Sequence, residues 1–275
     1  MPMFAGLRFV TAIAVAIMLA LPVSAAEPVP TADLYRAQTI VTGQGEVNRI
    51  LGFASCLEDV LVKLSGKLRL SGDPRLKPYK ADAAKLVRDF SYRDEKGGKP
   101  KNDEQGTRDR SFVLTAEFDE AAVNGILAKL GVKPWLARRP VLGVFVEMQP
   151  GARRYVVARD SKETDLQRAA LLAAAAKRGM SIVLPDAAAL AGAGANERAL
   201  VDIAQAKLVE VMAKQGGDVL LIARLVWDDR KLRWNADWQL EGQGKSQHWQ
   251  LAAVTFDEAF RQGIGGAAQI LAEQR

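Results

Sequence analysis

The residues that decide the fold are Val219–Leu251, VLLIARLVWDDRKLRWNADWQLEGQGKSQHWQL. The first nine are nearly all apolar, which is typical of a strand that is covered on both faces. Turn residues 228–230 follow, and apolar and polar residues then alternate over Leu232–Leu240 with the two-residue period of a half-buried strand. Gly242–Gly244 turns the chain again before a third strand. We therefore expect an antiparallel meander that is rich in tryptophan.

Strands and helices surround this meander in the sequence. A nearly continuous apolar run at Val141–Met148 predicts a buried strand, and an Ala/Leu-rich helix is expected over Asp165–Arg178. Asn196 is expected to cap a further helix, and Phe256–Leu271 to form the last one. Residues 140–275 are therefore predicted to form a C-terminal α/β unit with a mixed sheet that ends in the meander.

Residues 27–139 are predicted to form a separate N-terminal α/β unit. Its clearest element is a helix over Gln44–Leu64, in which apolar residues recur at three- and four-residue steps. A strand is expected over Ser111–Phe118 and a helix over residues 79–90, while the charge- and glycine-rich residues 93–108 are expected to form an exposed loop between two strands. The predicted fold class is therefore α/β (α+β), with two small units in tandem.

The first 26 residues have the three-part pattern of a secretory signal peptide. Arg8 precedes an apolar run over Phe9–Leu21, and small residues follow up to Ala26. The run is shorter than the roughly 20 residues that span a bilayer. We expect residues 1–26 to be cleaved, which predicts a periplasmic protein with no stable transmembrane span. An uncleaved N-terminal anchor is the alternative.

The composition limits the possible chemistry. Of 275 residues, 49% are hydrophobic and 25% are charged, which excludes an acidic disordered tail, a collagen-like chain and a multi-span membrane protein. Cys56 is the one cysteine and His248 the one histidine, so neither an internal disulfide nor a Cys₄ or Cys₂His₂ zinc site can form. We expect no cofactor, no metal and no catalytic residues, and a protein that is not an enzyme.

Basic residues gather between positions 63 and 88, where eight bases stand against two acids and the net charge is +6. This pattern suggests an electrostatic contact with an anionic polymer of the cell envelope; a solvated protein face is the alternative. An exported protein rarely meets nucleic acid, so we expect no such partner. The residues proposed for the contact are Lys63, Lys67, Arg69, Arg75, Lys77 and Lys80.

Four tryptophans lie close together in the sequence, at positions 227, 234, 238 and 249. Tryptophan can stack on a sugar ring or anchor a peptide. The alternation places Trp234 and Trp238 on the apolar face of their strand, which favours a core position, and leaves Trp227 and Trp249 as candidate aromatic contacts. A glycan-acting enzyme would need carboxylates beside these rings, for which Asp228, Asp237 and Glu241 are the candidates.

Several segments resemble one bacterial family. They are residues 34–43 (LYRAQTIVTG), 60–66 (VLVKLSG), 132–135 (VKPW) with Arg139-Pro140, 177–179 (KRG) with 183–186 (VLPD), and 219–223 (VLLIA) with the Trp234–Trp238 strand. Together they resemble the family catalogued as domain of unknown function 2066. The resemblance implies an exported envelope protein and assigns no activity. It gives no meaning to the glycine- and charge-rich insert at 94–107.

These observations predict a periplasmic, non-enzymatic protein that binds an envelope protein or an anionic envelope polymer. Two alternatives remain open: an enzyme that acts on cell-wall glycan, and a structural subunit of an envelope assembly whose sheet edge pairs with a partner strand.

Overall fold

The computed structural model describes residues 29–94, 110–196, 198–242 and 244–274. The expected signal peptide and most of the expected 93–108 loop lie outside these residues. The structure confirms the α/β class, with two separate sheets, one small and one large. Within the described residues, none of the helices has the length and apolar character that crossing a membrane requires.

The small-sheet unit holds the elements from α1 to α4, and its sheet has the antiparallel strand order β1-β3-β2. Its elements are α1 (Thr31–Leu34), β1 (Arg36–Thr42), α2 (Glu46–Ser65), η1 (Leu68–Leu70), η2 (Pro74–Leu76), α3 (Lys77–Ala81), η3 (Ala83–Leu86), β2 (Val87–Asp94), β3 (Ser111–Phe118) and α4 (Glu120–Lys129).

The long helix α2 covers one face of the small sheet. Leu57 and Leu61 on the helix and Leu114 and Phe118 on β3 are fully buried in one hydrophobic cluster. Gly52 brings the helix backbone close to the strands, because a Cβ at this position would clash with Leu114. Among the described residues, no such helix covers the opposite face of the sheet, which carries more polar side chains.

The large-sheet unit holds the elements from β4 to α8, in the strand order β5-β4-β7-β8-β9 with β6 beside β4. β4 runs parallel to β6 and β7, whereas β7, β8 and β9 form the expected antiparallel meander. Its elements are β4 (Leu142–Gln149), β5 (Tyr155–Val156), η4 (Lys162–Thr164), α5 (Asp165–Arg178), β6 (Ile182–Val183), α6 (Ala187–Ala193), η5 (Leu200–Asp202), α7 (Gln205–Lys214), β7 (Val219–Asp228), β8 (Arg233–Gly242), β9 (Lys245–Val254) and α8 (Phe256–Glu273).

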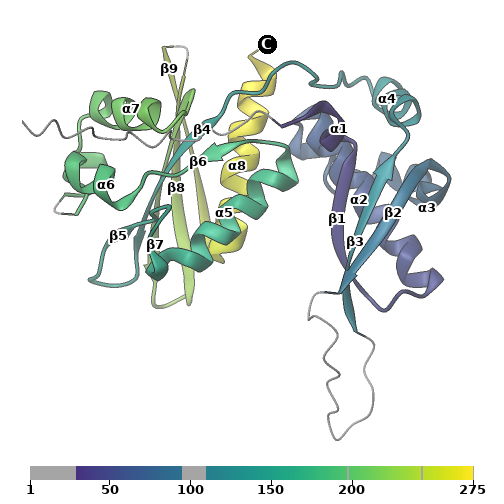
Figure 1. The fold of residues 1–275 in the computed structure, drawn as a ribbon, viewed down its shortest axis with the longest axis horizontal. Helices are drawn as coiled ribbons and strands as arrows, with labels where there is room; N and C mark the ends of the chain where they lie inside the picture. Colours follow the sequence, from purple (N-terminus) through teal and green to yellow (C-terminus); the bar gives the residue numbers. More distant parts are fainter. Residues whose placement is uncertain (1–28, 95–109, 197, 243, 275) are drawn as a thin grey trace, which may run out of the picture.

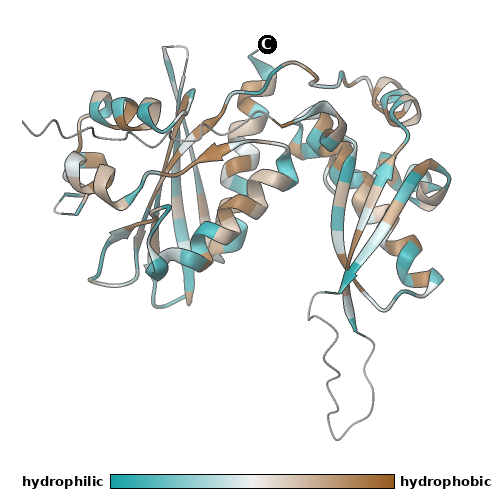
Figure 2. Ribbon diagram, in the orientation of Figure 1, coloured by the Kyte–Doolittle hydropathy of each residue, from teal (hydrophilic) through white to brown (hydrophobic). Residues whose placement is uncertain are grey.

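Helices cover both faces of the large sheet. Val144 on β4 belongs to the cluster that includes residues of α5 and α8, whereas its neighbour Phe145 packs with α6 and α7. α5 and α8 carry both hydrophobic and hydrophilic colours in Figure 2, as expected for helices with one apolar face. In Figure 1, α5 and α8 lie on the side of the large sheet that faces the small-sheet unit, and contacts between α5 and α2 join the two units.

Two predicted helices have different bounds in the structure. The expected helix over residues 79–90 is wrong, because helical turns end at Leu86 and Val87 begins strand β2, which pairs with β3. The helix expected to start at Asn196 begins only at Gln205, after a 3₁₀ turn at Leu200–Asp202. The backbone amide of Leu200 bonds to the buried carboxylate of Glu147 instead of continuing a helix.

Candidate functional site

The two units meet at a polar seam, formed by the ends of α2 and α5, the chain of residues 132–139 and α8. The guanidinium of Arg139 is buried there and donates to main-chain oxygens from three segments: Lys63 at 2.8 Å, Trp135 at 3.0 Å and Arg178 at 2.9 Å. Because α2 and α5 end at these carbonyls, Arg139 supplies donors and positive charge to both helix C-termini.

Lys63 is also buried in the seam. Its ammonium donates to the main-chain oxygens of Arg36, at 2.6 Å, and Asp33, at 3.2 Å. Burial lowers the pKa of Lys63 to about 8, against the opposing effect of the Asp59 carboxylate. Lys63 on α2 is therefore hydrogen-bonded to the first residue of β1.

Two clefts open on either side of one ion pair in the seam. Asp59 on α2 lies 3.0 Å from the ammonium of Lys177 on α5, and both residues line both clefts. The first cleft has a volume of about 410 Å³ and lies between α2 and α8. The second cleft has a volume of about 810 Å³ and lies between β1 and α5. Both volumes are in the range of small-ligand sites.

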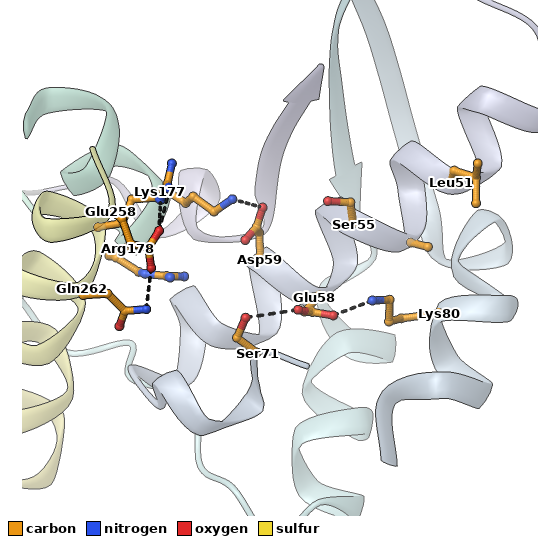
Figure 3. A pocket seen from close by; sticks show the side chains of 12 residues that line it. Leu51, Ser55, Glu58, Asp59, Ser71, Lys80, Lys177, Arg178, Glu258 and Gln262 are labelled. Carbon is orange, nitrogen blue, oxygen red and sulfur yellow. Dashed lines mark hydrogen bonds and ion pairs between the residues drawn. The ribbon is translucent and has the colours of Figure 1, made fainter. Parts of the chain in front are cut away.

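The wall of the first cleft carries three acidic and four basic side chains, each acid paired with a different base (Figure 3). Besides the Asp59 pair at the seam, Lys80 lies 2.5 Å from Glu58 and Arg261 lies 2.6 Å from Glu258. Arg178 remains as the fourth base. Of the cations that line this cleft, it alone forms no ion pair with a carboxylate in the described part of the chain.

Arg178 stands at the end of α5 and is 9% exposed. Its Nε and Nη1 atoms are buried and have no hydrogen-bond partner among the described residues. Burial lowers the pKa of Arg178, while Asp59 and Glu258 oppose that shift from a distance. In Figure 3 the side chain extends from α5 toward the α2 side of the cleft. A buried guanidinium with open donors is costly unless an acceptor reaches it.

Two glutamates of the cleft, Glu58 and Glu258, have lowered pKa values. Burial raises the pKa of Glu58, but hydrogen bonds from Lys80, Gly72 and Ser71 outweigh it, and the pKa is lowered overall. Hydrogen bonds from Arg261 and Gln262 lower the pKa of Glu258. A general acid needs a raised pKa, so these groups are arranged for ion pairing and ligand contact rather than for proton transfer.

The six basic residues proposed from the sequence do not share one surface. Lys63 does not lie on the surface, because its side chain is buried and donates to main-chain carbonyls. Lys67 pairs with Glu273, Arg75 with Asp73, and Lys80 with Glu58 inside the first cleft. Arg69 and Lys77 are exposed, and their contact with an anionic partner stays a prediction.

The two candidate tryptophans lie on the meander, away from both clefts. Trp249 stacks on the buried Trp238 with ring centroids 6.2 Å apart, and Trp227 meets Trp234 edge to face at 5.3 Å. Neither cleft is lined by a tryptophan or by Asp228, Asp237 and Glu241. Asp228 accepts from the main-chain amides of residues 230 and 231, which is turn chemistry.

Sequence reasoning missed Arg178. Basic residues in the last turn of a helix are ordinary partners of the helix dipole, so Lys177-Arg178-Gly179 carries no separate signal for a site. The cleft becomes visible only when α2, α5 and α8 are brought together, from three distant parts of the chain. Cys56, by contrast, is buried as expected, and burial raises the pKa of its thiol to about 12.

Comparison with known families corrects one expectation. Residues 29–136 match the model of a family described as Domain of unknown function (DUF8605). The resemblance to domain of unknown function 2066 is therefore wrong, because the matching model belongs to a different family. No curated protein matches the chain. The matched residues include the small-sheet unit and end at Leu136, inside the seam.

Proposed function

We propose that this protein is a non-enzymatic binding protein of the cell envelope, exported by its N-terminal segment, and that the first cleft receives an acidic group of its partner. The observation that carries the proposal is Arg178, which lines the cleft, is 9% exposed and is the one cation of the lining that has no carboxylate partner among the described residues. A carboxylate matches the planar fork of such a group and would form short, charge-assisted hydrogen bonds with it.

The rest of the cleft supports a partner with both acidic and apolar parts. The three neighbouring acids are already paired, so the lining carries one positive charge more than it has negative ones. Leu51 and Ala54 extend the wall along α2, where Leu51 is 64% exposed. In Figure 3, Leu51 and Arg178 lie at opposite ends of the cleft, which favours a polypeptide partner that carries a carboxylate and, some residues away, an apolar side chain.

Binding rather than catalysis is favoured by the chemistry of the lining. Glu58 and Glu258 have lowered pKa values and are engaged by lysine or arginine, so neither is poised to donate a proton near neutral pH. The sole histidine, His248, is exposed on β9 and bonds to Ser246. It lies outside both clefts.

The proposal is tested with a labelled peptide, Leu-Glu-Leu-Glu-Leu, titrated against the purified protein by fluorescence anisotropy. Arg178→Gln is expected to weaken binding at least tenfold and to reduce its dependence on salt. Arg153→Gln is the matched control, because Arg153 is an exposed arginine outside the cleft. Equal affinity of the two variants, or no binding to the wild type, would contradict the proposal.

A second set of variants tests the alternative basic surface. Reversal of Arg69 and Lys77 to glutamate changes exposed charges without touching the first cleft. If this double variant loses the peptide while Arg178→Gln keeps it, the anion binds to the exposed basic residues and not to the cleft.

A further inference from the structure

The second cleft borders a sheet edge whose main chain is unpaired. β1 is the terminal strand of the small sheet, and the lining of the cleft includes Arg36, Ala37 and Gln38 on that strand. The facing wall comes from α5, β6 and the connection between them, and it includes Leu172, Ala176 and Met180. A polypeptide placed in this cleft would lie alongside β1.

The pairing of β1 with β3 shows which of its groups are open. The amide of Phe118 bonds to the oxygen of Tyr35, and the amide of Gly43 bonds to Arg110. In antiparallel pairing the bonded residues alternate, so the odd-numbered residues of β1 face β3 and the even-numbered ones face outward. Main-chain groups of Gln38 and Ile40 therefore point away from the sheet.

The ends of this edge already have partners. The oxygen of Arg36 accepts from Lys63, and the oxygen of Thr42 accepts from the side chain of Asn48. Between them, the amides and carbonyls of Gln38 and Ile40 have no main-chain or side-chain partner within the residues that the structure describes. Four free groups on alternate residues are the pattern that one added strand satisfies.

β1 differs from the other edges in how it is protected. β2 has a register shift after Val87, and β9 has one opposite Trp234–Ala236; such shifts twist an edge and discourage pairing. β2 also carries charges along its length, whereas β1 (RAQTIVT) has none after Arg36 and keeps one register throughout. Among the long edge strands that the structure describes, β1 therefore combines an unbroken register with a bordering cleft.

The charges of the second cleft favour an uncharged occupant. Asp33 and Arg36 lie within 3.6 Å of each other, Asp59 pairs with Lys177, and Lys63 is bonded to carbonyls. The remaining wall is largely aliphatic, and Leu172 is 50% exposed. The cleft thus offers main-chain hydrogen bonds on one side and apolar contact on the other.

We propose that the second cleft binds an extended, uncharged segment of a partner polypeptide, which adds to β1 as a fourth strand of the small sheet. Main-chain bonds to Gln38 and Ile40 would hold the segment, and the α5 wall would select small or aliphatic side chains at alternate positions. This site is separate from the Arg178 contact, and its test does not depend on the proposed function.

The probe is a random heptapeptide library displayed on phage and selected on the purified protein. The enriched peptide is then synthesised and titrated by calorimetry against two variants at one position. Gln38→Pro removes the outward amide, a change that an edge strand tolerates because that amide makes no bond within the sheet. Gln38→Ala keeps the amide and removes only the side chain. We expect at least tenfold weaker binding to Gln38→Pro and less than a twofold change for Gln38→Ala.

Peptide chemistry provides a second test that needs no protein variant. Two versions of the peptide are N-methylated at alternate residues, one at the odd and one at the even positions. Strand addition predicts that one version loses binding and the other keeps it, because only alternate amides face β1. The proposal is overturned if no peptide is enriched, if both methylated versions bind equally, or if Gln38→Pro and Gln38→Ala bind alike. Loss of the peptide in Arg178→Gln would also overturn it, by placing the peptide in the first cleft.

Discussion

The core of the large-sheet unit is stabilised by apolar packing, whereas the seam between the units is stabilised by hydrogen bonds from buried charged groups. In the core, Trp238 is buried between the sheet and α8, and Gly263 on that helix makes room for its ring. In the seam, Arg139 and Lys63 are buried charges that bind main-chain oxygens. Shape therefore specifies the core, whereas directional hydrogen bonds specify how the units dock. We therefore expect the seam to be sensitive to the loss of a hydrogen-bond donor and the core to be sensitive to a change of side-chain volume.

Loss of Arg139 is expected to have the largest effect. Arg139→Leu keeps much of the side-chain volume but leaves the oxygens of Lys63, Trp135 and Arg178 without their donor in a buried site. We expect the free energy of unfolding to fall by about 3 kcal/mol, measured by urea denaturation.

Arg138→Leu is the matched control for this variant. Arg138 is 63% exposed and pairs with Asp218, so its removal should cost less than about 1 kcal/mol. Equal effects of the two leucine variants would mean that the seam is not held by the buried guanidinium.

A methyl group on α8 tests the core side of the comparison. A Cβ at Gly263 would overlap the ring of Trp238, whereas a Cβ at Gly125 on α4 meets no atom within 4 Å. Gly263→Ala should therefore lower the free energy of unfolding by about 2 kcal/mol, because the added methyl group overpacks the core. Gly125→Ala should raise it by up to about 1 kcal/mol, because alanine is the better helix former. Stabilisation by both substitutions would contradict the close approach of α8 to the sheet.

The same contrast explains what the sequence predicts well. The meander and α8 follow from local periodicity, since Ala236, Trp238 and Leu240 alternate with polar residues and are all buried. The one departure at its start is Leu232, which has a positive φ and is 61% exposed, because it belongs to the turn before β8. Helices and strands with one buried face can be predicted from the sequence, because the spacing of their apolar residues follows directly from that burial.

Elements decided by distant partners are recovered less well. Residues 79–90 contain good helix formers, but Val87 and the residues after it pair with β3, and that pairing overrides local propensity. The first cleft is harder still to predict from the sequence, because its walls come from three helices, α2, α5 and α8, that are far apart in the chain. In the sequence, Arg139 is only a charged residue before a proline. Nothing there indicates the three main-chain carbonyls to which its guanidinium donates.

The burial of Lys63 predicts a pH dependence that belongs to the seam. Its pKa is about 8 in the folded protein against 10.5 for an unhindered lysine, so the unfolded chain binds more protons between these values. Stability from this group must therefore rise as the pH rises through 8, by about 1 kcal/mol between pH 7 and pH 9. Urea denaturation at several pH values measures it, and Lys63→Met should remove the rise.

Cys56 sets the upper limit of that pH window. Its thiol has a pKa of about 12 in the folded protein against 9.0 when unhindered, so its contribution to stability falls above pH 9. The two slopes oppose each other there, which restricts the test of Lys63 to lower pH. A rise that persists in Lys63→Met would assign the effect to another group.

The ion pair that separates the two clefts is expected to have the smallest effect on stability and an informative effect on binding. Lys177 is 42% exposed on its side chain, so Lys177→Gln should cost only about 0.5 kcal/mol. The same change removes a positive charge from the first cleft and leaves the Asp59 carboxylate without its partner Lys177, so that Asp59 offsets more of the charge of Arg178. Binding of the acidic peptide to the first cleft should therefore weaken. Lys177 also lines the second cleft, but the selected uncharged peptide should lose less affinity there, because its proposed main-chain bonds to Gln38 and Ile40 do not involve Lys177. A parallel loss of both ligands would mean that the seam behaves as one site, and that the distinction between a charged and an uncharged cleft is wrong.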